Sequence, residues 1–272
     1  MKKIGFVDYY ISEWHANNYP EWIKNAAQKL GAEYEVAYAW AELDLSPVYN
    51  ETTDEWCAKM GVEKCETIAE LCEKSDFIIV LAPSNPEKHL GYAKEVLKYG
   101  KRTYIDKTFA PDLATAQEIF DIAKKYNTPF FSSSALRFAS ELEGKTDSLA
   151  IMTTGGGGNM PEYIIHQAEM VVKCLGVGAT SVDAYQVGGR MTFNVNYADG
   201  RSAQMTYADG MPFTALVTNK QGGSTYDMIQ SDFFAVLIEE MVKFFEGGQV
   251  CFDTAQTLEV MKIREWCVNK LN

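Results

Sequence analysis

Residues 77–81, Phe-Ile-Ile-Val-Leu, constrain the fold of this chain more than any other segment. An apolar run of this length between polar residues predicts a strand buried on both faces, as in a parallel sheet. Similar runs occur at residues 4–7, 34–39, 103–105 and 129–132, and helical patterns separate them. This alternation predicts βαβ units with right-handed crossovers, and hence an α/β, Rossmann-like domain.

Proline and glycine mark where the helices of this first half begin and end. Pro20 is predicted to open a helix that Gly31 ends, because proline suits the first helical position and glycine the residue after the last. Further helices are expected at residues 54–60, 67–73 and 86–99, and after Pro111. We therefore predict a Rossmann-like, dinucleotide-binding type of domain over residues 1–128.

The second half changes to the period-two alternation of antiparallel strands. Residues 129–272 are predicted to form an α+β domain with a mainly antiparallel sheet, backed by a helix over residues 162–175. The expected strands are residues 181–187, 191–197, 203–207, 213–218 and 224–229, with a hairpin turn at 198–201. Two final helices, 232–245 and 254–271, complete the chain and could pack back on the first domain.

Composition excludes several classes of partner. The net charge of −12 argues against nucleic acid and against anionic membrane surfaces. The first residues do not resemble a signal peptide, and no uncharged run approaches the length of a membrane span. The six cysteines lack the Cys-x-x-Cys spacing of metal sites. We expect reduced thiols and a cytoplasmic protein.

Lys107 follows the predicted strand 103–105, after Asp106. Open α/β sheets place their chemistry at this carboxyl edge. Burial readily lowers the pKa of a lysine, so an amine at this place can become a proton donor. The alternative is a lysine at a strand-to-helix turn that simply stays in solvent.

Several motifs occur in one order along the chain: Leu-Ala-Pro-Ser-Asn at 81–85, a helix containing His89, Gly-Lys at 100–101, Asp-Lys-Thr at 106–108, and Ser-Ala-Leu-Arg-Phe at 134–138. This order resembles that of the Gfo/Idh/MocA oxidoreductase family, in which Glu-Lys-Pro stands where this chain has Asp-Lys-Thr. The resemblance implies NAD or NADP as cofactor, with Ala82, Pro83, Asn85 and Asp106 near it. It also implies a sugar, cyclitol or related polyol as substrate, and a homo-oligomer formed through the second sheet.

The chain departs from the family pattern at the cofactor site. Family members carry a glycine-rich loop after the first strand, which lets the backbone approach the pyrophosphate. Here residues 8–20 contain no glycine, Tyr9 and Trp14 are bulky, and Asp8 and Glu13 would repel phosphate. Trp40 stands where the family has an acid for the ribose. One possibility is that NAD(P) binds at an altered site that includes Asp8, Tyr9 and Trp40. The other is that no dinucleotide binds, and the aromatic rings form the wall of a substrate pocket or fill the space that the cofactor would take.

A helix in the second half carries Glu162 and His166 on one face, because the two residues are four apart. The spacing Gly-Gly-Gly-x-x-x-Glu-x-x-x-His resembles the family's Gly-Gly-x-x-x-Asp-x-x-x-His helix. The resemblance implies that His166 is a general acid or base, with Glu162 beside it and Lys107 polarising the reacting hydroxyl. The alternative is a solvated polar stripe. The glycine run at 155–158 is either an anion cradle or a hinge.

Three further side chains are candidates for substrate contact: Trp14, His15 and Arg137. His15 could join Glu162 and His166 as a metal ligand, but the pattern is too weak to predict a metal site. His89 is expected to be structural.

Three functions are compatible with these residues. The first, which we take as the prediction, is NAD(P)-dependent oxidation of a sugar, cyclitol or related polyol, with Lys107 and His166 handling the proton. The second is a dinucleotide-independent lyase, isomerase or hydrolase on the same scaffold. The third is a non-catalytic sugar-binding or partner subunit. A fold alone does not distinguish them.

Overall fold

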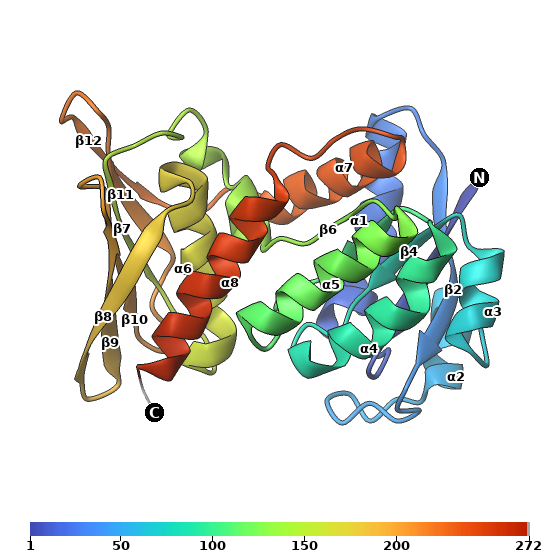
Figure 1. The fold of residues 1–272 in the computed structure, drawn as a ribbon. Coiled ribbons are helices and arrows are strands. Elements are labelled where there is room, and N and C mark those ends of the chain that lie inside the picture. Colours follow the sequence, from blue (N-terminus) through green and yellow to red (C-terminus); the bar gives the residue numbers. More distant parts are fainter. Residues whose placement is uncertain (271–272) are drawn as a thin grey trace. The chain divides into compact units, whose positions relative to one another are not determined.

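The computed structural model describes residues 1–270. It forms two units (Figure 1). The first contains residues 1–132 and 237–251, and the second contains residues 133–236 and those from Phe252 onward. The chain thus returns to the first unit near its end and then completes the second.

The first unit contains a six-stranded parallel sheet in the order β3-β2-β1-β4-β5-β6. This is the strand order of doubly wound dinucleotide-binding folds, so the predicted Rossmann-like class is confirmed. The central strands β1 and β4 are buried almost throughout, as their apolar runs predicted. The strands are β1 (Lys2–Asp8), β2 (Tyr34–Ala41), β3 (Glu63–Lys64), β4 (Phe77–Val80), β5 (Thr103–Ile105) and β6 (Phe130–Phe131).

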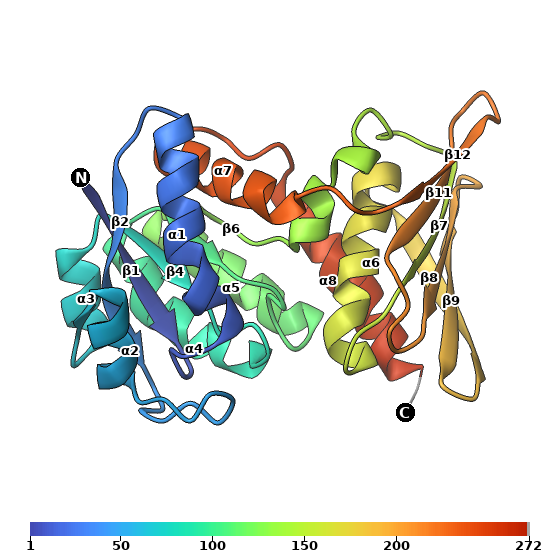
Figure 2. The same cartoon turned by 180° about the vertical axis from the view of Figure 1, so that it is seen from behind.

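Helices cover both faces of this sheet. α4 and α5 lie over one face (Figure 1), and α1 and α7 lie over the other (Figure 2). Arg102 donates hydrogen bonds to the carbonyl oxygens of Phe244 (2.7 Å) and Gly248 (2.9 Å), which fastens the end of α7 to the sheet. The helices are α1 (Trp14–Lys29), α2 (Thr53–Met60), α3 (Ile68–Lys74), α4 (Pro86–Val96), α5 (Leu113–Tyr126) and α7 (Phe233–Phe245), with a 3-10 turn, η1 (Leu97–Tyr99), after α4.

The predicted start of α1 was wrong. The helix begins at Trp14, and Pro20 lies inside it. Proline is common at the first helical position, which made Pro20 look like the start. The carboxylate of Glu13 caps the helix earlier by accepting hydrogen bonds from the backbone N–H groups of His15 and Ala16. Much of the stretch expected to be an irregular loop is therefore helical.

The second unit contains a six-stranded mixed sheet in the order β12-β11-β7-β10-β9-β8. All its neighbouring strands are antiparallel except the pair β7–β10, so the prediction of a mainly antiparallel sheet is confirmed. β7 was not predicted, because its sequence Ala-Ile-Met-Thr-Thr-Gly alternates weakly. The strands are β7 (Ala150–Gly155), β8 (Ala179–Val187), β9 (Arg190–Tyr197), β10 (Ser202–Tyr207), β11 (Thr214–Thr218) and β12 (Ser224–Met228).

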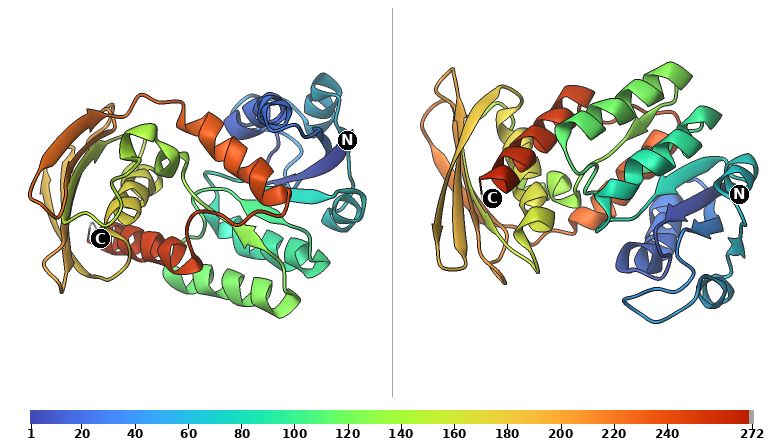
Figure 3. Two further views of the ribbon diagram at one scale, coloured as in Figure 1. Left: turned by 90° about the horizontal axis from the view of Figure 1, so that it is seen from above. Right: turned by 60° about the horizontal axis from the view of Figure 1, so that its bottom comes forward.

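Two long helices, α6 (Met160–Leu175) and α8 (Thr254–Asn269), pack on the same side of this sheet (Figure 3). Eleven of the sixteen residues of α6 are buried, which makes it the centre of the unit. The 3-10 turns η2 (Ala135–Phe138) and η3 (Ser140–Leu142) precede β7. The last helix was predicted to reach residue 271, which lies outside the described residues.

Within residues 1–270, no helix is both long enough and apolar enough to cross a membrane. The six cysteines are present as thiols, and all but Cys251 are buried. Burial raises the pKa of the Cys57 and Cys65 thiols to about 11, which makes them poor nucleophiles near neutral pH.

Candidate functional site

The carboxyl edge of the first sheet gathers acidic and aromatic side chains from β1, α1 and β5. β1 ends at Asp8, a short turn follows, and Glu13 caps α1. The Glu13 side chain lies 2.8 Å from the backbone nitrogen of His15 and 2.5 Å from that of Ala16. The backbone amides at the start of the first helix are the groups that hold a pyrophosphate in dinucleotide-binding folds. Here the chain's own carboxylate occupies them.

Asp8 is a buried carboxyl group with one unsatisfied oxygen. Its Oδ1 atom accepts hydrogen bonds from the backbone nitrogens of Tyr9 (2.7 Å) and Ala82 (3.0 Å). Its Oδ2 atom has no hydrogen-bond partner within the described residues. Burial raises the pKa of Asp8 well above its usual range, and the neighbouring Glu13 raises it further. The raised pKa favours the neutral form of this buried carboxyl group.

Asp106 holds His15. The carboxylate Oδ2 of Asp106 is hydrogen bonded to His15 Nδ1, while its Oδ1 accepts from the Tyr104 hydroxyl (3.1 Å) and the Lys107 amide (2.8 Å). Burial raises the pKa of Asp106, but His15, Lys107 and these hydrogen bonds outweigh it and lower the pKa below its usual value. Asp106 therefore stays a carboxylate and orients the imidazole. The His15 ring also stacks on Tyr19, with ring centroids 5.0 Å apart.

Lys107 lies half-buried at the end of β5, as its position in the sequence predicted. The next peptide bond, Lys107–Thr108, is cis. The Thr108 amide donates to the carbonyl oxygen of Pro83 (3.2 Å). The segment that carries Lys107 is thus tied to the turn after β4.

The turn after β4 holds the three other residues expected near a cofactor: Ala82, Pro83 and Asn85. Ala82 has a left-handed backbone with φ of 59°, and its amide is bonded to Asp8. Asn85 precedes α4 and donates to Glu87 (3.1 Å). The turn is therefore held mainly by contacts within the protein.

At the end of β2, too, the side chains are engaged with other residues of the protein. Trp40 packs edge-on against Tyr92, with ring centroids 5.8 Å apart. Glu42 pairs with Lys88 (2.5 Å) and accepts from the Tyr92 hydroxyl (2.8 Å), and the bond to Lys88 lowers the pKa of Glu42. Lys88 also lies 4.5 Å from the centre of the Tyr9 ring. The acid nearest to a ribose-binding position is thus engaged with its own protein.

His89 is structural, as expected. It is completely buried in α4, with Nδ1 3.0 Å from the carbonyl oxygen of Phe109 and Nε2 2.6 Å from that of Leu81. Burial lowers the pKa of this imidazole. His89 bridges the ends of β4 and the segment after β5.

In the second unit, His166 lies on α6 and is half-buried. Its Nδ1 atom lies 2.6 Å from the hydroxyl oxygen of Ser134. The rings of Tyr163 and Phe213 meet it edge-on, at centroid distances of 5.6 and 5.7 Å. The sequence predicted a site residue at His166 and did not single out its partner Ser134, whose only signal was its place in the 134–138 motif.

Glu162 sits in the first turn of α6 and takes part in its cap. Asn159 accepts from the Glu162 amide (2.9 Å) and donates to the Glu162 carboxylate (2.9 Å). Two of the preceding glycines are in close contact with their neighbours: a Cβ at Gly156 would lie 1.7 Å from the carbonyl oxygen of Ala208. A Cβ at Gly157 would lie 2.0 Å from the Tyr163 ring.

Two expected substrate-contact residues differ in exposure. Trp14 is 45% exposed at the start of α1 and packs edge-on against Trp22. Arg137 is only 3% exposed and pairs with Glu169 at 2.6 Å. Its guanidinium lies over the Phe252 ring at 4.2 Å. The structure therefore uses Arg137 as a buried support in the second unit.

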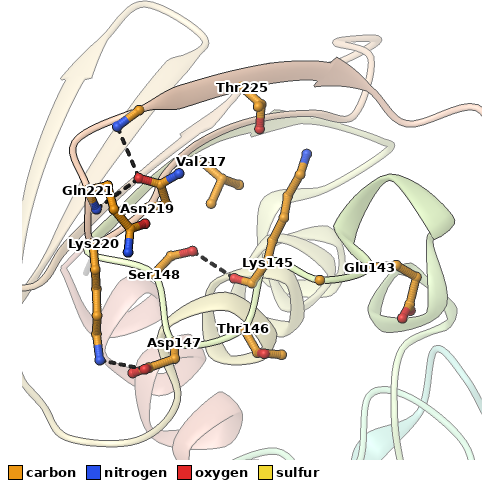
Figure 4. Close-up of a pocket in the computed structure, with 12 residues that line it drawn as sticks. Glu143, Lys145, Thr146, Asp147, Ser148, Val217, Asn219, Lys220, Gln221 and Thr225 are labelled. Atoms are coloured by element: carbon orange, nitrogen blue, oxygen red, sulfur yellow. Dashed lines mark hydrogen bonds and ion pairs between the residues drawn. The ribbon is translucent and has the colours of Figure 1, made fainter.

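The second unit also has a polar hollow of about 500 Å³ between residues 143–148 and the β11–β12 hairpin (Figure 4). Lys220 pairs with Asp147, and Lys145 pairs with Asp227. Because these charges compensate each other, the hollow is a weak candidate for a charged ligand. Within residues 1–270, no group of three or more His, Cys, Asp or Glu side chains could hold a metal ion.

A dinucleotide does not fit the first unit in the usual manner. Its pyrophosphate would need the α1 amides that Glu13 occupies, and its ribose would need an acid at the end of β2, where Glu42 is paired with Lys88. The Glu13 carboxyl group would also occupy the place of a phosphate at these amides. Glu13 and Glu42 are thus already engaged within the protein at the two places where the dinucleotide would be held.

The fold defines the class as a two-unit α/β protein with a Rossmann domain and an α+β second unit. A model of the Gfo/Idh/MocA family, described as "Oxidoreductase family, NAD-binding Rossmann fold", matches residues 25–133. This segment of the chain is therefore similar to the NAD-binding Rossmann domain of that oxidoreductase family. The match begins inside α1, after the segment that lacks glycine.

One curated relative and two solved structures illustrate the similarity. An uncharacterized oxidoreductase of Escherichia coli K12, YhhX, is 36% identical over 55 residues, which is 20% of this chain and 16% of the relative. UDP-N-acetylglucosamine 3-dehydrogenase GnnA from Acidithiobacillus ferrooxidans is 14% identical, with a TM-score of 0.74 over 99% of this chain and 97% of that one. Biliverdin reductase from Synechocystis sp. PCC 6803, solved with biliverdin and NADP+, is 12% identical, with a TM-score of 0.69 over 98% of each chain. At these identities the two structures establish the fold alone.

Proposed function

We propose that this chain is an enzyme that transfers protons on a hydroxylated small molecule, such as a sugar, cyclitol or related polyol, without holding NAD or NADP at α1. The reaction class is that of a lyase or isomerase. Lys107, His166 and Glu162 are the proposed catalytic residues, and His15 is proposed to contact the substrate.

The observation that carries this proposal is the cap of α1. Glu13 accepts hydrogen bonds from the amides of His15 and Ala16, which are the groups that a pyrophosphate would need. Displacing Glu13 would leave a buried carboxylate without its partners, which is costly. An oxidoreductase of this fold depends on the cofactor for the hydride. Without that cofactor, the remaining chemistry is proton transfer.

The acid–base side chains favour an enzyme over a binding subunit. Lyase and isomerase reactions need one group that removes a proton and another that returns one. Asp106 orients His15, and Lys107 follows in the same segment. A non-catalytic subunit has no need of a buried carboxylate that fixes an imidazole.

The second candidate is NAD(P)-dependent oxidation of the same class of substrate. The family description favours it, and the biliverdin reductase relative contains NADP+. The dehydrogenase GnnA acts on a nucleotide sugar, which supports a sugar-like substrate for either candidate. This second candidate requires that the dinucleotide be held without the α1 amides.

Calorimetric titration with NAD+, NADH, NADP+ and NADPH separates the two candidates. We expect no binding at millimolar concentrations, and saturable binding would overturn the proposal. A panel of sugars and cyclitols, incubated in D2O without cofactor, then tests turnover by NMR detection of deuterium incorporation. Lys107→Ala and His166→Asn are expected to abolish incorporation, while Lys220→Ala, far from both in the sequence, is expected to leave it unchanged.

We also propose that the chain forms a homo-oligomer through the open face of the second sheet. The strand register places large, exposed side chains on that one face. These are Met152, Tyr185, Val187, Tyr226 and Met228, each at least 38% exposed. Exposed tyrosine and methionine side chains are enriched at protein interfaces, and polar residues such as Gln204 and Asn194 lie between them on this face.

A further inference from the structure

In the second unit, His166 is hydrogen bonded to a serine hydroxyl, and that serine is held in turn by the buried ion pair of Arg137 and Glu169. Ser134 lies just before η2, and its Oγ is 2.6 Å from Nδ1 of His166, which lies 32 residues later on α6. Ser134 Oγ also accepts a hydrogen bond from the Leu136 amide at 3.2 Å. The hydroxyl thus has a donor on one side and the imidazole on the other.

The direction of the bond to His166 follows from the hydrogen count. A serine hydroxyl has one hydrogen to donate, and neutral imidazole has one nitrogen that donates and one that accepts. Ser134 is completely buried, so its hydroxyl hydrogen needs an acceptor within the protein. Among the described residues, Nδ1 of His166 is the acceptor that lies against this hydroxyl, while the Leu136 amide donates to its oxygen. We propose that Ser134 is a positioning residue that donates to Nδ1 and thereby fixes the proton of neutral His166 on Nε2.

Ser134 is itself held by a buried frame. Its backbone nitrogen donates to Glu169 Oε1 (3.1 Å), and Arg137 Nε donates to the other oxygen of the same carboxylate (2.6 Å). The side chains of Arg137 and Glu169 are only 4% and 3% exposed. Arg137 Nη1 donates in turn to Gln256 on α8 (2.9 Å). Because α6, α8 and η2 share this network, the serine cannot move without disturbing it.

The fixed tautomer gives His166 a specific part in the chemistry. With the proton on Nε2, neutral His166 presents a hydrogen-bond donor on that side of the ring. Such a donor stabilises negative charge that develops on a substrate oxygen, as a neutral imidazole can do in a preorganised site. In this form His166 is not the base, so another group removes the proton. This catalytic meaning rests on the proposed function, whereas the tautomer does not.

Nitrogen NMR of the whole protein tests the inference without a substrate. The chain has three histidines, and the spectrum of His166→Asn assigns the signals of His166 by their absence. At a pH where His166 is neutral, we expect an acceptor-type shift for Nδ1 and a protonated-type shift for Nε2. A protonated Nδ1 in the wild-type protein would overturn the proposal, whatever the result of the cofactor titration.

Variants separate a positioning role from a merely structural one. Ser134→Ala is expected to move both nitrogen shifts of His166 toward the values of mixed tautomers, and Ser134→Thr to restore them. Ser148→Ala is a matched control, because that buried hydroxyl donates to the carbonyl oxygen of Lys145 and not to a histidine. An unchanged His166 spectrum in Ser134→Ala would also overturn the proposal. If the alanine variant does not fold, the wild-type spectrum decides alone.

Discussion

Glu13 Oε2 lies 2.8 Å from the backbone nitrogen of His15, so the first helix of this Rossmann domain is capped by its own carboxylate. In dinucleotide-binding folds the same amides receive a phosphate. The His15 side chain is hydrogen bonded to Asp106, a residue 91 positions away at the end of β5. The first turn of α1 therefore contains both the amides that Glu13 caps and the imidazole that is bonded to Asp106.

Removal of this cap should weaken the fold and open the anion site. We expect Glu13→Ala to lower the free energy of unfolding by about 1 kcal/mol, because two backbone N–H groups lose their acceptor. The same variant should gain binding of inorganic pyrophosphate, measured by calorimetry. Glu21→Ala is the matched control, since Glu21 is exposed on the same helix. Equal stability and equal pyrophosphate binding in the two variants would contradict the role of Glu13.

Asp8 should make the protein less stable as the pH rises. Burial raises its pKa in the folded state, so the folded protein holds this proton more tightly than the unfolded chain. Its contribution to stability is complete below the unfolded pKa of about 3.9 and declines by about 1.4 kcal/mol per pH unit until the folded pKa is passed. Asp8→Asn should remove this decline. Denaturation of both proteins from pH 4 to pH 8 tests it, and parallel curves would exclude the effect.

The loss of the buried ion pair between Arg137 and Glu169 should lower the free energy of unfolding far more than the loss of a surface pair. Glu169→Gln leaves a buried guanidinium without its counter-charge, and we expect a loss of about 3–5 kcal/mol in the free energy of unfolding. Lys220→Ala removes an exposed pair with Asp147 and should cost at most about 0.5 kcal/mol. Urea denaturation measures both. Similar losses in the two variants would mean that the buried pair is not the support described above.

Two neighbouring glycines should respond differently to alanine. A Cβ at Gly156 would lie 1.7 Å from the Ala208 carbonyl oxygen, whereas a Cβ at Gly158 would meet nothing within 4 Å. We expect Gly156→Ala to lower the melting temperature strongly, and Gly158→Ala to change stability by less than about 1 kcal/mol. Thermal denaturation followed by circular dichroism gives both values. If Gly156→Ala is harmless, the run is a hinge and not a close contact.

A charged side chain introduced on the open face of the second sheet should dissociate the proposed homo-oligomer, so the mass measured in solution should fall toward that of the monomer. Tyr226 is 61% exposed on that face, and Tyr226→Lys would place a charge in the proposed contact. Val48→Lys, at a residue that is also 61% exposed but lies in the first unit, should have no effect. Light scattering after size-exclusion chromatography measures the mass. A monomeric wild-type protein would contradict the proposed homo-oligomer.

The sequence by itself determined the class of both sheets, parallel and mainly antiparallel, although it missed β3 and β7. The apolar runs at β1 and β4 can only be satisfied by burial on both faces, and the alternation at β9 and β10 requires one covered face. It also placed Lys107 at the end of a parallel strand, because a strand's end is a local property. The starts of helices were less well predicted. Pro20 was predicted to be the start of α1, but the helix begins at Trp14, where the Glu13 side chain caps it.

Only the tertiary structure decided which side chains meet. Asp106 and His15 are 91 residues apart, Ser134 and His166 are 32 apart, and Arg137 reaches Gln256 over 119 positions. No periodicity encodes such pairs, because they depend on how complete helices and strands pack. The burial of Arg137 and the capping by Glu13 follow from the same packing. Local pattern fixes which elements form, whereas the paired contacts between distant elements define the chemistry that they carry.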